Sequence, residues 1–355
     1  ERVIAQQKNI REISYPQAVG EFARGKKLIA ICGSHGKSST TAMVARLMIE
    51  AGLDPTVVVG TKLRELDGRN WRQGNSDWFV LEACEYRPSF LHYEPSIILL
   101  TNADIDHLDY YKSQEDYCTA FVEFVEKLPA DGLLITHRSD PESAKIAKAS
   151  NGEMGDADSE PMIAMQTPGE HMQHNAQLAL TLAKELGIDT HKATSILGGF
   201  SGTWRRMEEK GTILDDVLVI DDYGHHPVEI QATLKALSEA HPTRRLVCVF
   251  QPHTHDRTLK LYDDFIEAFT CADVVIIPNI FDARHQIETD SVDVPQFVKD
   301  IEECSGVMAL NGASLQETEK LLREKVLQPH DLLVIMGAGD VSKLATKLTS
   351  PQPLS

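Results

Sequence analysis

The sequence predicts an α/β protein with parallel sheets, divided into two domains. Its 355 residues exceed the size of one ordinary domain, since domains average about 100–200 residues. Hydrophobic residues make up 42% and charged residues 25%, the usual balance of a globular protein with a substantial core. Short apolar runs alternate with helical patterns in both halves, as strand–helix–strand units of a parallel sheet do.

In the first half, short apolar runs predict buried strands at residues 28–32, 78–81 and 97–100. Helical patterns predict helices at residues 39–51, 114–128 and 174–186. Gly52 and Gly187 follow two of these helices as stop signals. A central domain over residues 23–203 is therefore expected.

The second half repeats the alternation after a glycine-rich stretch at residues 198–206. Strands are predicted at residues 217–220, 246–250, 274–278 and 332–336. Helices are predicted at residues 227–239, 260–270 and 315–326. These elements predict a smaller, Rossmann-like α/β domain over residues 204–355, whereas residues 1–22 are too few for a domain.

The charge of the chain limits its partners. A net charge of −18, from 35 basic and 53 acidic residues, argues against nucleic acid and anionic membranes as partners, because both attract basic surfaces. Small anionic ligands remain compatible, since a few placed cations and backbone N–H groups suffice to bind them. No apolar run is long enough to predict a membrane span. The scattered cysteines, without a C-x-x-C pair, favour core thiols in a cytoplasmic protein.

The most specific local pattern is a glycine-rich turn between the strand at residues 28–32 and the helix after it. Its members are Gly33, Ser34, His35, Gly36, Lys37, Ser38 and Ser39. Backbone N–H groups of such a turn, at a helix N-terminus, bind phosphate oxygens. Lys37 can reach the β- and γ-phosphates, and the Ser38 hydroxyl can hold Mg²⁺. Ile31 stands where the general phosphate-binding loop (P-loop) has its first glycine, so the sequence predicts a shortened P-loop for Mg–ATP rather than a plain serine-capped turn.

Polar residues follow the next two predicted strands. Glu82 and Glu85 end the strand at 78–81, where a P-loop protein places a metal ligand or a group that orients water. His107 ends the segment TNADIDH after the strand at 97–100 and could ligate a divalent ion. The alternatives are a solvated strand end and a structural histidine. The absence of an Asn-Lys-x-Asp motif disfavours a GTPase.

In the second half, two polar clusters follow consecutive strands. IDDYGHHP at residues 220–227 and FQPHTHDRT at residues 250–258 are denser in acids, histidines and arginine than packing requires. Such clusters at strand ends predict a binding edge. A zinc site formed by the histidines is disfavoured, because neither cysteines nor regular ligand spacing accompany them.

Seven motifs in order identify a family resemblance. GSHGKSST, EACEYRPSF with TNADIDH, PGEHMQHNA, FSGTWRRME, DDYGHHPVE, FQPHTHDRT and MGAGD occur between about residues 8 and 345. Together they resemble the Mur ligases of peptidoglycan precursor synthesis, and most of all the L-alanine-adding branch. The resemblance implies that ATP phosphorylates the carboxylate of UDP-N-acetylmuramate to an acyl phosphate. L-alanine then attacks, and an amide, ADP and phosphate result.

The resemblance also implies roles for residues of the central domain. Lys37 would hold the transferring phosphate, while Ser38 and Glu82 would ligate one Mg²⁺. His107 would serve a second metal ion near the acyl phosphate. His171 and Asn175 match the family's nucleotide-contacting element, although Met172 replaces its first asparagine.

For the C-terminal domain, the resemblance implies further contacts. Arg206 would reach the ATP phosphates and Asp222 the ribose. The amino-acid side would be lined by Tyr223, His225, His226 and Arg257. Arg257 is suited to pair with the free carboxylate of L-alanine. The implied catalytic set is Lys37, Glu82, His107, His225 and Arg257.

Some features depart from the family pattern. Thr254 stands where many relatives carry a second arginine, and the stretch after Asp140 is shorter. Residues 1–22 resemble only the exit of the family's first, UDP-binding domain, so we expect this chain to bind ATP but to hold the UDP-sugar poorly unless that domain is supplied separately, in trans. Two alternatives therefore stay open, a related ligase that joins a ready-made peptide to the same sugar nucleotide and an ATP-binding module without ligase activity.

Overall fold

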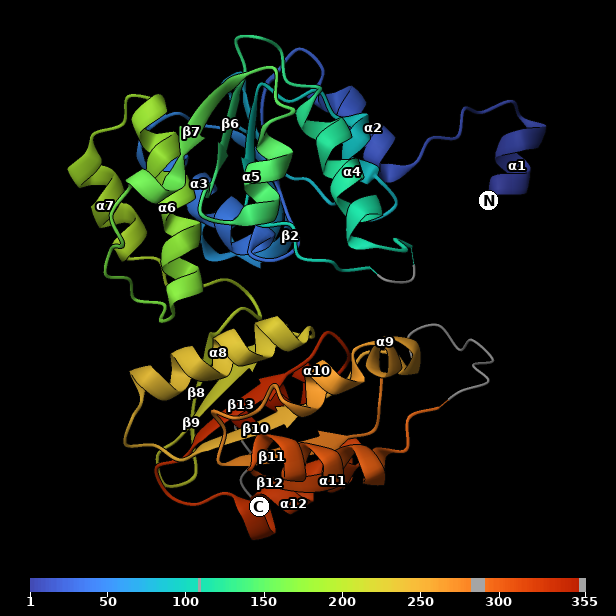
Figure 1. Cartoon of the computed structure of the whole chain (residues 1–355), viewed down its shortest axis with the longest axis vertical. Coiled ribbons are helices and arrows are strands. Elements are labelled where there is room, and N and C mark those ends of the chain that lie inside the picture. Colours follow the sequence, from blue (N-terminus) through green and yellow to red (C-terminus); the bar gives the residue numbers. More distant parts are fainter. Residues whose placement is uncertain (108–109, 282–290, 351–355) are drawn as a thin grey trace. The chain divides into compact units, whose positions relative to one another are not determined.

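The computed structural model describes residues 1–107, 110–281 and 291–350, which form two compact units (Figure 1). The first unit comprises Glu1–Ala164 and Gln173–Gly199, and the second comprises Met165–Met172 and Phe200–Ser355. Each unit contains one mainly parallel sheet, which confirms the predicted α/β class. The expected domain limits after residues 22 and 203 remain predictions. No helix of the described residues is both long and apolar enough to cross a membrane.

The first unit is built on a seven-stranded sheet in the order β3-β2-β4-β1-β5-β6-β7. Only the edge strand β3 runs antiparallel to its neighbour. The strands are β1 (Lys27–Cys32), β2 (Thr56–Leu63), β3 (Arg69–Arg72), β4 (Trp78–Glu82), β5 (Ile97–Leu100), β6 (Leu133–Thr136) and β7 (Glu153–Asp156). The predicted strands are confirmed as β1, β4 and β5. The sequence does not reveal β3 and β7, because these edge strands are mostly exposed and lack an apolar run.

Helices cover both faces of this sheet (Figure 1). The helices of the first unit are α1 (Arg2–Gln7), α2 (Tyr15–Ala23), α3 (Lys37–Glu50), α4 (Gln114–Val125), α5 (Pro141–Ala147), α6 (Glu170–Glu185) and α7 (Thr190–Gly198), with short 3₁₀ turns at Arg64–Leu66, Ser89–His92 and Ala157–Ser159. Of these, α1 has no buried residue and does not cover the sheet. One face packs against α2, α4 and α5 around Phe90, Phe121 and Phe124. On α3, Met43, Val44 and Leu47 are buried as the helical pattern predicts.

The second unit has a six-stranded sheet in the order β12-β11-β10-β13-β9-β8. The strands are β8 (Glu208–Ile213), β9 (Val217–Asp222), β10 (Leu246–Phe250), β11 (Val274–Pro278), β12 (Met308–Ala313) and β13 (Leu332–Met336). The four predicted strands are confirmed as β9, β10, β11 and β13. The edge strands β8 and β12 are only partly buried, so their apolar pattern is weak.

The helices of the second unit correct two predictions. They are α8 (Pro227–Ala240), α9 (His255–Lys260), α10 (Tyr262–Ile266), α11 (Val294–Ser305), α12 (Leu315–Leu321) and α13 (Ser342–Thr349). A single helix over 260–270 is wrong, because the backbone leaves helical geometry at Leu261 (φ −114°, ψ 23°) and Phe265 packs into the core beyond the break. The helix expected over 315–326 changes at Leu322 into a π-helical turn, Leu322–Val326.

The strand register brings the polar segments of each unit to one edge of its sheet. In the first unit, Ile31 pairs with Glu82 and Cys32 with Leu100, so the chain leaves β1, β4 and β5 at the same level. In the second unit, Asp222 of β9 and Phe250 of β10 both pair with Met336 of β13. Ligands of open α/β sheets bind at this carboxyl edge.

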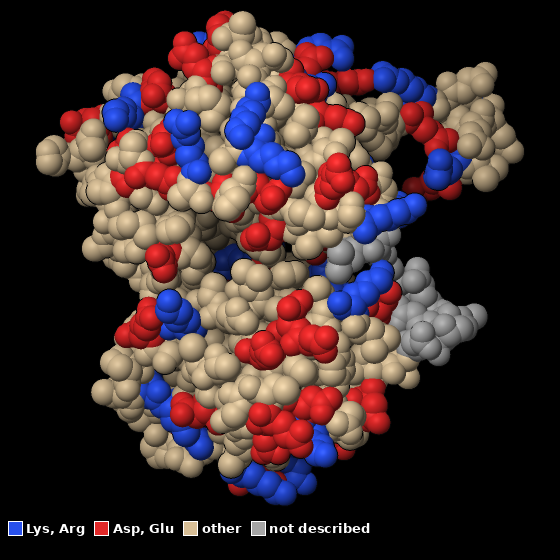
Figure 2. Space-filling view, in the orientation of Figure 1, with Lys and Arg blue, Asp and Glu red and all other residues tan. Residues whose placement is uncertain are grey.

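The surface carries the acidic balance of the sequence. On the face drawn in Figure 2, basic and acidic side chains are interspersed over both units. The described residues form no continuous basic band on that face. This distribution agrees with a net charge of −18, and the absence of a nucleic-acid partner remains a prediction.

Candidate functional site

The loop between β1 and α3 is held from both sides by the segment after β5. Gly33 has a φ of 131°, and a Cβ there would collide with Thr101 Oγ1 and the backbone of Asn102. Ser34 N–H donates to Asn102 O (3.1 Å) and His35 N–H to Asn102 Oδ1 (2.9 Å). Thr101 Oγ1 in turn donates to His35 O (2.6 Å). The loop is therefore fixed before any ligand arrives.

The second glycine of the loop faces α6. Gly36 has a φ of 82°, a left-handed conformation that favours glycine. A Cβ at this position would lie 2.5 Å from Asn175 Oδ1. Ser38 and Ser39 are buried in the first turn of α3, which begins at Lys37 directly after the loop. The structure thus brings the predicted loop and Asn175 together.

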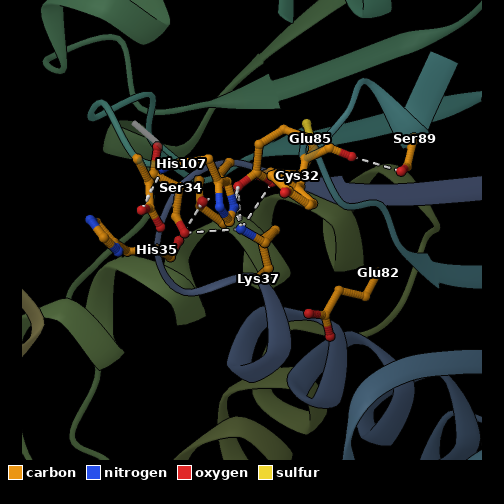
Figure 3. A network of polar contacts seen from close by, with 12 residues as sticks. Cys32, Ser34, His35, Lys37, Glu82, Glu85, Ser89 and His107 are labelled. Carbon is orange, nitrogen blue, oxygen red and sulfur yellow. Dashed lines mark hydrogen bonds and ion pairs between the residues drawn. The ribbon is translucent and has the colours of Figure 1, made fainter. Parts of the chain in front are cut away.

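The Lys37 ammonium makes three hydrogen bonds, two to carbonyls of its own loop and one to Glu85 (Figure 3). Its ammonium donates to Gly33 O (2.6 Å), to Ser34 O (2.9 Å) and to Glu85 Oε1 (3.0 Å). Burial is the largest single influence and lowers the pKa of Lys37, but the neighbouring groups, Glu85 first, together raise the pKa above its usual value. Lys37 is therefore charged at neutral pH, as phosphate binding requires.

Glu85 lies at the centre of this network, whereas its place after a strand predicts only a metal ligand or a group that orients water. Its side chain is fully buried, and both oxygens lie 3.0 Å from Lys37 Nζ. His107 Nε2 lies 3.2 Å from Oε1, and the Tyr117 hydroxyl donates to the same oxygen (3.4 Å). Burial raises the pKa of Glu85, but Lys37 and then His107 lower it, so that the net pKa lies below its usual range. No pattern in the sequence could reveal these contacts, because the four residues come from separate segments.

Glu82 forms a second group of oxygens at the start of α3, apart from the Lys37–Glu85–His107 network (Figure 3). Ser38 Oγ donates to Glu82 Oε1 (2.9 Å), and Gly60 N–H donates to Oε2 (2.6 Å). A hydroxyl and a carboxylate side by side are hard oxygen donors of the kind that Mg²⁺ takes together with phosphate oxygens and water. These residues fit the expected metal. Within the described ranges, no three potential metal ligands of the His, Cys, Asp and Glu types cluster.

The described part of the His107 loop ends in an unusual backbone conformation. His107 has a φ of 55°, and its N–H donates to Asp106 Oδ1 (2.6 Å). Its ring lies against Tyr86, with ring centroids 4.8 Å apart. A non-glycine residue with positive φ is strained and often marks a functional loop.

The start of α6 rests on a buried histidine that sequence reasoning missed. His137, at the end of β6, bonds Asp158 Oδ1 through Nδ1 (2.8 Å) and His174 O through Nε2 (3.0 Å). This places the turn that carries Asn175 against the sheet. His171 belongs to the second unit, where its ring covers Gly169 so closely that a Cβ there would collide with it.

In the second unit, two adjacent arginines flank Tyr223. Arg206 lies over the Tyr223 ring (5.0 Å to the centroid), with its Nη1 3.7 Å from Glu229 Oε1. Arg205 is buried on Asp221, with Nε 3.5 Å from Oδ1, and donates to Gly337 O. Burial raises the pKa of Asp221 to about 6 even though Arg205 lowers it. Arg205 therefore ties the segment GTWRRME to the loop after β13.

Asp222, expected at the ribose, is buried and fully bonded to the backbone. Its Oδ2 accepts from Met207 N–H and its Oδ1 from Gly224 N–H, both at 2.7 Å. Burial is the largest influence on its pKa, which is raised. A ribose hydroxyl would compete for these oxygens with the N–H groups of Met207 and Gly224. The ribose contact therefore remains a prediction.

Three neighbouring rings, those of Tyr223, His225 and His253, lie near the other predicted residues of the amino-acid side. Ring centroids are 5.5 Å apart for Tyr223 and His225 and 6.2 Å apart for His225 and His253. His226 is the N-cap of α8, where its Nδ1 accepts from Val228 N–H (3.4 Å). The structure therefore brings Tyr223 and His225 together, whereas the His226 ring caps the N-terminus of α8.

Arg257 lies in the first turn of α9, where the Thr254 hydroxyl accepts from its N–H (3.4 Å). Thr254 itself has a φ of 66°, which is a true outlier for a β-branched residue. The same residue departs from the family pattern at the sequence level. Backbone strain at a predicted substrate loop agrees with a binding role for this segment.

Comparisons with known proteins find one family in both units. Residues 31–158 match the Mur ligase middle domain, and residues 205–339 match the Mur ligase, glutamate ligase domain. The chain is 35% identical to the UDP-N-acetylmuramate–L-alanine ligase of Desulfitobacterium hafniense, with 97% of this chain and 82% of that protein covered.

Solved structures share the fold. The UDP-N-acetylmuramate–alanine ligase of Thermotoga maritima matches with a TM-score of 0.77 at 24% identity, covering 98% of this chain and 80% of that one. A murein peptide ligase of Psychrobacter arcticus matches with a TM-score of 0.68 at 22% identity, covering 99% and 83%. At these identities the likeness concerns the fold.

The substitution Gly36→Ala is expected to abolish binding of a Mg–ATP analogue, because its Cβ would meet Asn175 Oδ1 and the left-handed backbone would be strained. The matched control is Gly25→Ala. Gly25 also has a positive φ, of 78°, but a Cβ there meets nothing within 4 Å. Isothermal titration calorimetry on both variants checks this. Equal affinities would show that the loop does not carry the nucleotide.

The raised pKa of Asp221 predicts a pH effect on stability. Between its unfolded value of 3.8 and about 6, folded Asp221 keeps a proton that the unfolded chain releases. The stabilisation from this group is thus full below pH 3.8 and is lost as the pH rises to about 6. It amounts to about 3 kcal/mol at most, at about 1.4 kcal/mol per tenfold change in proton affinity.

The variant Asp221→Asn lacks this titration, so its stability relative to wild type should improve as the pH rises from 4 to 7. Urea unfolding at a series of pH values measures the difference. Asp215→Asn, a change at an exposed neighbouring carboxylate, is the control. A constant difference between Asp221→Asn and wild type over that range would contradict the assignment.

Proposed function

The chain belongs to the Mur ligase family and is an ATP-dependent ligase of that type, and from this premise we propose that it joins L-alanine to UDP-N-acetylmuramate. The observation that carries the proposal is 35% identity to an L-alanine-adding ligase over 97% of the chain. The motif DDYGHHP followed by FQPH, typical of that branch, supports the same substrate. The Mur ligase middle domain binds ATP, which is one of the substrates of the proposed reaction.

The first chemical step is transfer of the γ-phosphoryl group from ATP to the sugar carboxylate. We assign Lys37 to the transferring phosphate. The backbone N–H groups at the N-terminus of α3 would face the phosphate chain, since those of Ser34 and His35 donate to Asn102. Such a transfer requires positioning and charge neutralisation more than covalent help from the protein. Ser38 and Glu82 would hold Mg²⁺, and His107 a second ion; such ions neutralise phosphate charge.

The second step is attack of the amino group of L-alanine on the acyl phosphate, which releases phosphate. Arg257 would pair with the alanine carboxylate, and Tyr223 and His225 would line the amino-acid side. Arg206 would reach the phosphates and Asp222 the ribose. His171 and Asn175 would contact the nucleotide.

Phosphate release is the direct test of this function. The protein is incubated with UDP-N-acetylmuramate, ATP and Mg²⁺, and then with either L-alanine or a ready-made peptide. Release that depends on L-alanine is expected. Release only with the peptide would assign the chain to the peptide-joining ligases, and ATP binding without release under either condition would identify an ATP-binding module.

The substitution Lys37→Ala is expected to abolish this release and to lower the melting temperature without unfolding the protein at the assay temperature. The phosphate loses its cation, and the buried Glu85 carboxylate loses its partner, which destabilises the fold. Lys184→Ala is the matched control and should keep full activity, because the Lys184 side chain is 67% exposed and its ammonium pairs with Glu160 (3.3 Å). Normal turnover of Lys37→Ala would refute the role of the loop.

A further inference from the structure

We propose that Glu85 is a positioning residue that fixes Lys37 and His107 relative to one another, so that the phosphate-binding lysine and the histidine act as one unit. The proposal rests on the proposed function, because it matters only if both side chains face the transferring phosphate. It assigns to Glu85 a role different from the metal ligand or water-orienting group that its place after a strand predicts. Glu85 would touch neither phosphate nor substrate, since its own negative charge would repel them.

Glu85 contacts both Lys37 and His107, and we call this group of three side chains the Glu85 hub. The Glu85 carboxylate is fully buried, and Lys37 Nζ donates to Oε1 (3.0 Å) and lies 3.0 Å from Oε2, which has no hydrogen-bond partner. The Oε1 atom also faces His107 Nε2 at 3.2 Å. Lys37 is the first residue of α3, and His107 belongs to the segment after β5. The negative charge of Glu85 therefore links these two segments.

Neighbouring tyrosines hold Glu85 itself in place. The Tyr111 hydroxyl donates to Glu85 O (2.5 Å), and the Tyr117 hydroxyl to Oε1 (3.4 Å). Tyr117 also shares a hydrogen bond with Ser34 Oγ (2.8 Å), which ties it to the phosphate loop. A buried side chain fixed at both its carboxylate and its backbone has little freedom to follow a ligand. It therefore sets the position of its partners rather than adapting to them.

The state of Lys37 indicates how the hub would work. All three N–H groups of its ammonium are accounted for by Gly33 O, Ser34 O and Glu85. A phosphate can compete with the two neutral carbonyls, whereas leaving a buried carboxylate unpaired is strongly unfavourable. Lys37 would therefore exchange its carbonyl contacts for the phosphate and stay on Glu85. The lysine would pivot about a fixed carboxylate.

The histidine side follows from the chemistry of imidazole. A carboxylate only accepts at neutral pH, so the nitrogen that faces Glu85, Nε2, carries the proton. The other nitrogen, Nδ1, is then the one that could meet a ligand. Carboxylates that orient a histidine in this way fix both its tautomer and its ring plane, and their loss typically costs about 10–100-fold in metal affinity or activity.

The test compares Glu85→Gln with wild type. The amide keeps the shape but removes the charge that both partners share. We expect kcat to fall about 10–100-fold, while the Kd for a Mg–ATP analogue changes less than about threefold. The control is Asp331→Asn, which removes another buried carboxylate that receives an arginine, Arg245, on both oxygens. Its kcat should stay at the wild-type value.

A second measurement does not need activity. In ¹⁵N-histidine NMR spectra of the ligand-free protein, with His107 assigned by comparison with His107→Asn, we expect the Nε2–H tautomer. Glu85→Gln should shift the His107 resonances and leave His137 unchanged. A wild-type His107 in the Nδ1–H form would overturn the proposal even if the variant did not fold.

The outcomes separate this proposal from the proposed function. If the wild-type protein has no ligase activity, the proposed function is wrong. The NMR result alone then tests whether Glu85 orients His107. With wild-type activity, an unchanged kcat in Glu85→Gln refutes the positioning role. A parallel loss of kcat, affinity and melting temperature would assign Glu85 to folding and would also refute it.

Discussion

The buried ion pair between Lys37 and Glu85 is the interaction on which the arrangement of the first unit depends. Burying either charge alone would cost several kcal/mol, so each residue requires the other. The pair joins the loop after β1 to the end of β4, and His107 extends it to the segment after β5. Three strand ends are thereby held in one charged network.

The backbone around this pair has little room to vary. Gly33 faces Thr101, and Gly36 faces Asn175, at distances that exclude a Cβ. The parallel register sets β1, β4 and β5 at one level, which brings their polar ends within reach of one another. The fold therefore supplies a preorganised phosphate site, and preorganised charges lose little energy in reorganisation when a ligand reacts.

Much of this could be predicted from the sequence, and the limits have physical reasons. The strand–glycine turn–helix pattern locates Lys37 and Ser38, because that signal is local. Glu82 and His107 follow from their places after apolar strands. The hub role of Glu85 depends on tertiary contacts with Tyr117 and His107, which no spacing reveals. Edge strands β3 and β7 lack an apolar run, and the break at Leu261 has no proline or glycine to announce it.

When a nucleotide binds, Lys37 should remain on Glu85 and turn from its own loop carbonyls to a phosphate. A crystal structure with Mg²⁺ and a non-hydrolysable ATP analogue would show this directly. We expect Lys37 Nζ to leave Gly33 O and Ser34 O, to contact a β- or γ-phosphate oxygen and to keep its bond to Glu85. A nucleotide bound elsewhere, or a Lys37 that leaves Glu85 or stays on both carbonyls, would contradict this expectation.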